Sequence, residues 1–457
     1  MKRKIIIALF TISCMTLSAQ ETTPTSASMV GQGKVLSLQQ LKDSALNNNI
    51  AIRTARFDME AARHQRQEAF TKYFPNISGT GLWFNANKGM AQMDVNPSEF
   101  IPSSLAAMLS QQLPPEVLSS MANPTSISMM KNGTIGSLMA MQPIFAGGQI
   151  INGNKLARLG EDVSRLQLRR SENEVEKTTE QYYWQLVTLQ EKMKTIKAVE
   201  TFLSDIYKDV DVAVRAGVAL PNDRLQVQLR QNDVASQKLK LQNGIFLMKQ
   251  LLRQYANLGS DFEIAAPSME SQELPIGKDE SGVRLVPEYQ LLDKQVEATG
   301  LQHKIAIGQQ LPSVAVGAGY NYHNLLDKDR TFGMIFATVS IPISDWWGGS
   351  HSIKRKKIEH QKAKEQLEDT EQLLLIRMQN AWNSVQETYQ QLQLAQKGIE
   401  QAEENLRLNR NYYQAGTSRM SDLLEAQLLY QQACDKRTDT FAEYQNKRLE
   451  YRQAVGQ

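Results

Sequence analysis

The sequence has few cysteines that could form disulfides, few aromatic residues and no long apolar run that could hold it in a membrane. Cysteine occurs twice in 457 residues, and aromatic residues make up only 7% of the chain. After the N-terminus, no run reaches the ~20 apolar residues of a membrane-spanning helix. The 51 basic and 48 acidic residues nearly balance, and three of the cations are Lys2, Arg3 and Lys4. These absences exclude a helical membrane protein and give no electrostatic reason to expect nucleic-acid binding.

The first 19 residues have the layout of a secretory signal peptide. Three cations precede a short apolar stretch, and Ala19 offers a small residue at a cleavage point. Cys14 raises the alternative of a lipoprotein, but the residues before it match a lipobox poorly, so we assign it to the signal. The mature chain then keeps only Cys434, which excludes an internal disulfide. Residues 20–36 are expected to form a flexible N-terminal segment.

The rest of the chain is an internal duplication. Gln142-Pro143-Ile144-Phe145 before Gly147-Gly148 corresponds to Ile341-Pro342-Ile343 before Gly348-Gly349, and Ala216-Gly217 corresponds to Ala415-Gly416. Pro143 and Pro342 lie 199 residues apart, as do Ala216 and Ala415. Pro75 corresponds to Pro312 at the larger offset of 237. The first repeat therefore carries an insertion, which we place in the methionine-containing stretch 88–132 and interpret as an enlarged loop.

Each repeat is predicted to contain a helix, two strands, a long helix and a return helix. The first repeat, residues 37–257, has expected strands near 76–85 and 133–142, a long helix at 148–215 and a return helix at 221–256. A linker follows at 258–282. The second repeat, 283–457, has expected strands near 313–323 and 331–341, a long helix at 350–414 and a return helix at 420–455. The first helix is expected to pause at Asn47-Asn48-Asn49.

Two periodicities support these elements. Residues 313–323 alternate between an apolar and a small or polar face, and each strand is about the 9–11 residues that a tilted transmembrane strand needs. Seven-residue ladders in the long helices indicate coiled-coil packing. The first ladder is Leu168, Val175, Tyr182, Leu189, Ile196, Leu203 and Val210; the second is Met378, Val385, Leu392, Ile399, Leu406 and Tyr413.

Four strands are too few to close a membrane barrel, because single-chain barrels have eight or more. Open strand edges in lipid leave backbone groups unsatisfied. We therefore expect copies of the chain to complete the sheet, three copies giving a water-filled barrel of twelve strands. Helices of about 100 Å would project from it into the periplasm and close into a tube in the same way. The predicted fold class is a mixed α and β membrane protein that is complete only as a trimer.

The proline-led strand entries, the glycine pairs and the Ala-Gly breaks, in this order and duplicated, resemble the TolC-type outer-membrane efflux proteins over nearly all of the mature chain. The resemblance implies a homotrimeric outer-membrane β-barrel joined to a periplasmic α-barrel. It implies a passive exit duct with no cofactor and no catalysis. The implied partners are a periplasmic adaptor (membrane fusion) protein, an inner-membrane pump of RND or ABC type, and outer-membrane lipid.

The resemblance also assigns residues at the periplasmic tip. Asp422 and Glu425 match two acidic positions that ring the narrowed pore, with Glu in place of the second Asp, and their spacing puts both carboxylates on one helix face. Compensation of the helix dipole is the alternative role for these acids. Asp223 and Tyr413 match a gate latch, whereas the latch arginine falls on Ser418, one residue before Arg419. Tyr413 could equally serve packing in the heptad ladder.

Trp83, Phe84, Trp346 and Trp347 are candidates for aromatic anchors at the membrane interface, with packing at the strand–helix junction as the alternative. The histidines show no metal-ligand spacing, and we interpret the loop methionines as adaptable apolar residues rather than soft-metal ligands. Three functions remain open: a duct for small molecules or metal ions, a duct for type I protein secretion, and, more distantly, a soluble periplasmic coiled-coil scaffold.

Overall fold

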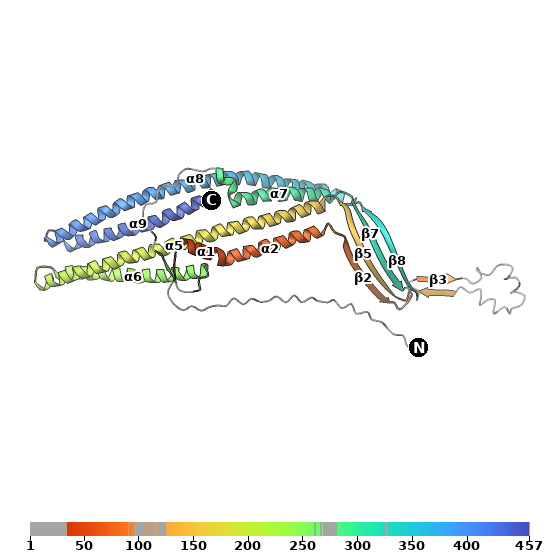
Figure 1. Cartoon of the computed structure of the whole chain (residues 1–457), viewed down its shortest axis with the longest axis horizontal. Helices are drawn as coiled ribbons and strands as arrows, with labels where there is room; N and C mark the ends of the chain where they lie inside the picture. Colours follow the sequence, from red (N-terminus) through yellow and green to blue (C-terminus); the bar gives the residue numbers. More distant parts are fainter. Residues whose placement is uncertain are drawn as a thin grey trace.

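The computed structural model describes residues 34–89, 91–95, 125–259, 262–265, 281–324 and 328–456, together with residues 105, 108, 114, 116 and 267. The expected signal peptide 1–19 lies outside the described residues, as do residues 20–33 and much of the loop 88–132. The molecule is elongated, with paired long helices at one end, a curved sheet toward the other, and a narrow hairpin beyond the sheet (Figure 1).

Helices make up most of the described chain. The long helices are α5 (Gln149–Arg215) and α8 (Asp345–Gln414), and each folds back into a return helix, α6 (Pro221–Tyr255) or α9 (Met420–Ala454). The halves of the long helices that lie nearer the sheet are flanked by α2 (Ile50–Thr71) and α7 (Pro287–Gly308). Two shorter elements are α1 (Leu38–Asn48) and the 3₁₀ helix η2 (Ser281–Leu285). With 67 residues, α5 is about 100 Å long.

The main sheet has four antiparallel strands in the order β2-β5-β7-β8. They are β2 (Asn76–Asn85), β5 (Asn132–Ala146), β7 (Ser313–Asn324) and β8 (Asp329–Ser340). Each strand adjoins one helix: α2 leads into β2, β5 into α5, α7 into β7, and β8 into α8. The helices therefore lie side by side in the same order as the strands (Figure 1).

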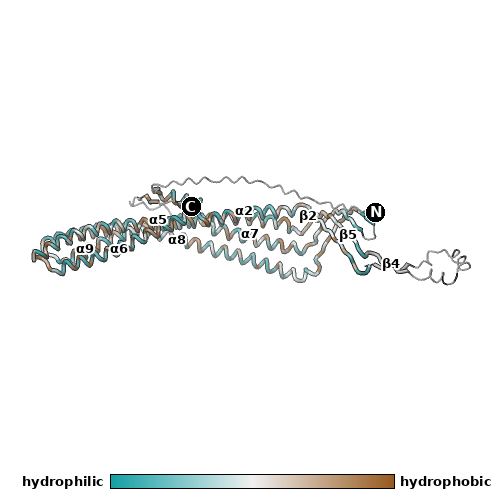
Figure 2. Tube along the Cα trace, turned by 90° about the horizontal axis from the view of Figure 1, so that it is seen from below, coloured by the Kyte–Doolittle hydropathy of each residue, from teal (hydrophilic) through white to brown (hydrophobic). Residues whose placement is uncertain are grey.

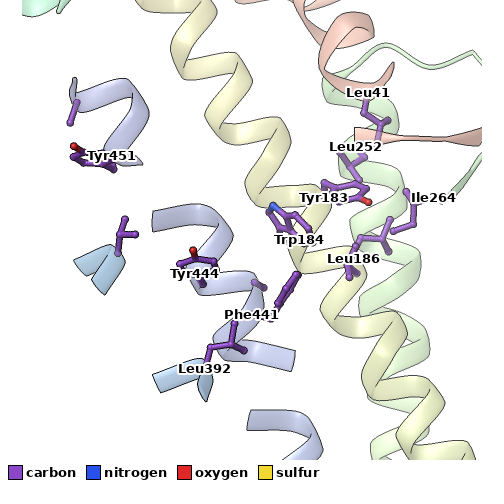
Figure 3. Packing of buried hydrophobic residues seen from close by; sticks show 14 of the residues in the cluster. Leu41, Tyr183, Trp184, Leu186, Leu252, Ile264, Leu392, Phe441, Tyr444 and Tyr451 are labelled. Atoms are coloured by element: carbon purple, nitrogen blue, oxygen red, sulfur yellow. The ribbon is translucent and has the colours of Figure 1, made fainter. Parts of the chain in front are cut away.

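Heptad packing builds the core of the helical part. Every residue of the two ladders is buried or half-buried, and Val175, Leu203, Val210 and Val385 are at most 1% exposed. Hydrophobic and hydrophilic residues alternate along the helices (Figure 2). Where the two repeats meet, Trp184 of α5 and Phe441 of α9 pack edge to face with ring centroids 5.6 Å apart (Figure 3). Aromatic pairs of this kind hold the two helical hairpins together.

The expected pause after the first helical stretch is confirmed, and its cause is a single side chain. Asn49 has extended backbone angles between α1 and α2, and its side-chain oxygen accepts from the N–H of Ala51 at 2.8 Å. Its side-chain nitrogen donates to the Tyr255 carbonyl at 2.9 Å, at the end of α6. Asn49 thus starts α2 and fixes the break against the first hairpin.

The structure corrects the predicted N-terminal segment and the predicted linker. The segment 20–36 was expected to be flexible, but it ends in strand β1 (Lys34–Leu36), which pairs in parallel with β6 (Phe262–Ile264). The stretch 258–282 therefore contains a strand, and η2 begins at Ser281. Alternation cannot be recognised over three residues, so this pairing could not be predicted from the sequence pattern.

Two further expectations are wrong. The enlarged loop 88–132 contains a hairpin of β3 (Ala91–Val95) and β4 (Thr125–Met129). The glycine pairs are also not equivalent. Gly147 and Gly148 have positive φ and form the turn before α5, whereas Gly348 and Gly349 lie inside α8, which starts at Asp345 rather than 350. Sequence alignment matched the residue type but not the backbone conformation.

Candidate functional site

The two hairpin turns lie together at the end of the molecule farthest from the sheet (Figure 1). Each turn has a glycine in the left-handed region, Gly217 with φ 75° and Gly416 with φ 74°. The N–H groups of Gly217 and Gly416 donate to the carbonyls of Val214 and Tyr413, both at 3.0 Å. The following N–H in each turn reaches one residue further back, which is the Schellman pattern that ends a helix. The duplication is therefore preserved down to single hydrogen bonds.

Asp422 lies in the first turn of α9 and caps its own helix. Its carboxylate accepts from the backbone N–H of Arg419 at 3.2 Å and from the hydroxyls of Ser418 and Ser421, both at 3.1 Å. These hydrogen bonds, the backbone one first, lower the pKa of Asp422 below its ordinary value. Asp223, 199 residues earlier, caps α6 in the same way by accepting from the Leu220 N–H at 3.3 Å.

Glu425 lies one turn further along α9, and its side chain is exposed. The position 199 residues earlier is Gln226, so only the second repeat carries two acids at this spacing. Asp422 is exposed as well, which places both carboxylates on the solvent-facing side of the α9 start. The geometry therefore gives Asp422 a capping role and leaves Glu425 without such a role.

Of the three residues matched to the gate latch, two are brought close together. Tyr413 is half-buried in an apolar cluster at the tips that contains Ile206, Val210, Val227, Met420 and Leu423. Burial and the negative charges of Asp223 and Asp209 raise the pKa of the Tyr413 hydroxyl. Arg419 precedes α9, is exposed, and makes no side-chain ion pair within the described ranges. Both of the roles considered for Tyr413, packing in the heptad ladder and part of a gate latch with Asp223, are therefore compatible with its position.

A buried polar network joins the two return helices, and sequence reasoning missed it. Arg230 of α6 donates to Gln427 at 3.3 Å and to Gln431 at 2.8 Å, and Gln431 donates to Gln237 at 2.8 Å. Gln427 and Gln431 are 1% and 4% exposed. Burial lowers the pKa of Arg230. The sequence pattern does contain a sign of this network. Met420, Leu423, Gln427 and Gln431 have the spacing of one helix face, so the two glutamines lie where the apolar side of the helix continues.

The sheet has two chemically different faces, which follow from its register. One face carries exposed apolar side chains, with Ile335 at 89% and Trp83 at 71%; its other members include Ile77, Leu138, Tyr320 and Val339. The opposite face combines polar residues (Ser78, Thr80, Ser137, Asn321 and His323) with Met139, Phe332, Met334 and Phe336. Along β7, the residues of the second face are less exposed than those of the first, as expected for the concave side. We call the first face the outer face and the second the inner face.

The four candidate interface aromatics divide between these environments. Trp83 lies on the outer face, but Phe84 follows it in the strand and must point to the inner face. Phe84 thus cannot share the role expected for Trp83. Trp346 donates from its indole nitrogen to the Gln310 carbonyl at 2.9 Å, so it packs where α7 meets β7, which is the alternative considered for it. Trp347 is 83% exposed.

No group of three or more His, Cys, Asp and Glu side chains among the described residues could hold a metal ion. No helix in the described part of the chain has both the length and the apolar character needed to cross a membrane. The one cysteine described, Cys434, is half-buried and free.

Comparison with known proteins supports the resemblance found in the sequence. Residues 290–457 match the family model described as outer membrane efflux protein. No curated protein matches the chain.

Solved structures match the fold over nearly its full length. The CmeC outer membrane channel of Campylobacter jejuni has a TM-score of 0.75 at 16% identity, covering 92% of this chain and 85% of that one. VceC of Vibrio cholerae gives 0.72 at 15%, covering 92% and 96%. The open-state MtrE outer membrane channel of Neisseria gonorrhoeae gives 0.72 at 16%, covering 92% and 88%. CmeC and MtrE are described as channels and not as enzymes.

Proposed function

We propose that the chain is the exit duct of a tripartite efflux system. Two observations support this: residues 290–457 match the outer membrane efflux protein family model, and the fold resembles outer-membrane channels over nearly the whole chain. Three copies form a twelve-stranded barrel in the outer membrane of a Gram-negative bacterium and a tube of helices in the periplasm. The duct is passive: it has no cofactor and performs no chemistry.

The observation that carries this proposal is the pair of open edges of the sheet. Strands β2 and β8 each have one partner among the described residues, and their other edges are unpaired. The outer face next to these edges is apolar, as a lipid-facing surface requires. Since unpaired backbone groups in lipid are costly, β8 of one copy pairs with β2 of the next. Neighbouring strands alternate in direction around the sheet, so this pairing is antiparallel as well.

The helices offer matching edges. Across the layer of helices in one chain, α2 and α6 lie at one edge and α8 lies at the other. These helices expose large apolar side chains that the single chain leaves uncovered: Ile50 and Phe57 on α2, Leu239 and Phe246 on α6, and Ile358, Ile376 and Leu394 on α8. A second copy of the chain covers them at the same step that closes the sheet. This surface also argues against a monomeric soluble scaffold.

The cargo consists of small molecules, such as drugs, toxic compounds or metal ions, delivered by an adaptor protein and an inner-membrane pump of RND or ABC type. A duct for type I protein secretion has the same architecture and is the second candidate. Conductance of the purified protein in planar bilayers, together with its oligomer mass, tests the proposal. A trimer that conducts supports it. A monomer that stays folded without detergent and gives no conductance contradicts it.

Asp422 and Glu425 form the acidic ring of the periplasmic constriction in this proposal, and Asp223 with Tyr413 forms part of the closing contact. Arg419 is the third residue assigned to this contact, one position after the matched one. Three copies of each acid around the axis attract cations. We expect Asp422→Asn with Glu425→Gln to abolish the block of single-channel current by multivalent cations. The amide at position 422 keeps an acceptor for the helix cap, so loss of block reports charge rather than unfolding.

The matched control is Asp205→Asn, an exposed acid on α5 that belongs to neither the proposed ring nor the closing contact, and it should leave the block intact. Unchanged block in the double variant would place the constriction elsewhere along the duct.

A further inference from the structure

A large groove lies where the helices meet the sheet. Its volume is about 1240 Å³, and it is bounded by the end of α2, the start of α5, the middle of α7 and the bases of β2, β5 and β7. Of its strand residues, Asn76, Met141, Pro143 and Ala315 belong to the inner face of the sheet, and Ile77 belongs to the outer face. Most of the strand residues at the groove therefore face the interior of the proposed duct, at the level where the helical tube joins the barrel.

Small residues of α5 make the floor of the groove. A Cβ atom added to Gly153 or Gly160 would meet no atom within 4 Å, so open space lies directly above the helix at both positions. Ala157 lies between them on the same side. Since α2 and α7 of the same chain flank α5 on either side, a neighbouring copy that adds to the outer edges of α2 and α8 does not fill this space.

The chemistry of the walls is apolar with a few hydrogen-bonding groups. Apolar side chains come from the strand bases and from α5, and amides come from α5 and α7: Phe74, Ile77, Met141, Pro143, Ile150 and Leu156, with Gln149, Asn154, Gln295 and Gln302. The charged groups largely cancel. Lys294 pairs with Glu297 at 3.1 Å, and Glu68 and Lys72 are one helical turn apart. No site for an ion results.

We propose that this groove binds uncharged, largely apolar organic molecules of drug size as they pass through the duct. Its volume is slightly above the roughly 300–1000 Å³ that is usual for pockets of such ligands, and its lining has their usual composition. Met141 gives the wall an adaptable, polarizable surface that suits ligands of varied shape. The inference rests on the proposed function, and it favours small-molecule efflux over protein secretion, since a polypeptide needs no drug-sized groove in the wall.

The test fills the groove without removing any contact. In Gly153→Leu with Gly160→Leu, the new side chains enter open space, and leucine stabilises a helix interior relative to glycine. The matched control is Gly398→Leu in α8, where an added Cβ also meets nothing within 4 Å, far from the groove. The trimers are placed in lipid nanodiscs and titrated with the neutral aromatic probe N-phenyl-1-naphthylamine, with empty nanodiscs as the background.

We expect saturable fluorescence enhancement in the wild type and in Gly398→Leu, and at least tenfold weaker binding in the double variant. Equal binding in all three proteins, or no binding above the empty nanodiscs in the wild type, would overturn the inference. Bilayer conductance of the same preparations separates this outcome from failure of the duct itself. A conducting trimer without groove binding refutes only the groove, whereas absence of a conducting trimer refutes the proposed function.

Discussion

A single lysine ties the first helix to the long helix beside it. The ammonium of Lys42 on α1 contacts Glu180 of α5 and lies 3.1 Å from a carboxylate oxygen of Glu176. The other oxygen of Glu180 accepts from the indole N–H of Trp184 at 3.3 Å. The side chains of Lys42 and Glu180 are only 8% and 5% exposed. Because these charges are out of water, each needs the other to remain buried.

Removing one partner should therefore be costly. We expect Lys42→Met to lower the free energy of unfolding by about 3–5 kcal/mol, because the buried Glu180 carboxylate keeps only the exposed guanidinium of Arg452, 4.0 Å away, as a counter-charge. The control is Lys192→Met, whose pair with Asp439 is more exposed and should contribute about 0–1 kcal/mol. Guanidinium unfolding followed by circular dichroism measures both. Equal, small losses in the two variants would mean that water reaches Glu180.

The cap made by Asp422 predicts a pH dependence. Its folded-state pKa is lowered, so its stabilising effect is fully present above the unfolded value of about 3.9 and is lost only as pH falls through the still lower folded value. The stability difference between wild type and Asp422→Ala should thus be constant from pH 7 to pH 5 and shrink only below about pH 4. Unfolding curves at successive pH values measure it. A difference that already disappears near pH 6 would contradict the capping role.

At the scale of elements, two turns with left-handed glycines differ in what surrounds them. An added Cβ at Gly416 meets nothing within 4 Å, whereas at Gly147 it would lie 2.1 Å from the carbonyl oxygen of Gly308 at the end of α7. We expect Gly416→Ala to cost about 1–2 kcal/mol, the strain of a left-handed residue alone. Gly147→Ala should cost more, because α7 must move away from the β5–α5 turn. Thermal unfolding of the two variants compares the costs.

The substitutions Gly147→Ala and Gly416→Ala should also differ in which secondary structure is lost first. Displacement of α7 should weaken the pairing of β5 with β7, so Gly147→Ala should lose strand signal in circular dichroism before helix signal, and Gly416→Ala should not. The same order of loss in both variants would show that the close approach of Gly147 and Gly308 does not position the sheet.

Elements with long periodic patterns could be predicted from the sequence. The heptad ladders specify α5 and α8 because each repeats one contact many times, and alternation specifies β7 because one face is apolar. Short elements could not be predicted. Strands β1 and β6 have three residues each and depend on pairing across more than 200 residues. The start of α8 was misplaced because glycine is read as a helix breaker, although Gly349 allows close approach to the Gln310 side chain.

In the candidate site, too, local features could be predicted from the sequence and long-range contacts could not. The position of Asp422 could be predicted from the duplicated Ala-Gly break, because the turn geometry is local. Its cap to Arg419 is equally local, because the two residues are three positions apart. The packing of Tyr413 against both hairpins depends on how two turns 199 residues apart meet. The Arg230 network depends on contacts between α6 and α9. A single sequence carries no information on such long-range pairs beyond a polar interruption of an apolar face.

At the scale of the whole molecule, the duplication explains why the four-stranded sheet of one chain has two open edges, one from each repeat. Two similar repeats, each supplying two strands and a helical hairpin, pack side by side and leave one outer edge each. The repeats have diverged in opposite regions. The first carries the β3–β4 hairpin beyond the sheet, and the second carries the paired acids Asp422 and Glu425 at the tip. In a trimer each of these features therefore appears three times, at alternating positions around the axis.

Closure of the sheet between copies can be tested by disulfide formation. In a Cys434→Ser background, Gly81→Cys on β2 is combined with one cysteine on β8, scanned through Thr331, Gly333 and Ile335, all on the outer face. Within one chain, β2 and β8 are three strand spacings apart, roughly 14 Å, too far for a disulfide. A disulfide between these strands must therefore join two molecules.

At least one of these pairs should give crosslinked dimers and trimers after oxidation of membranes, because the proposed barrel places β8 of one copy beside β2 of the next. A control that pairs Gly81→Cys with Ala318→Cys, on the outer face of the interior strand β7, should stay monomeric, since both edges of β7 are already occupied by β5 and β8. Monomers at every scanned position, from protein that conducts in bilayers, would mean that the barrel closes through some other pair of strands.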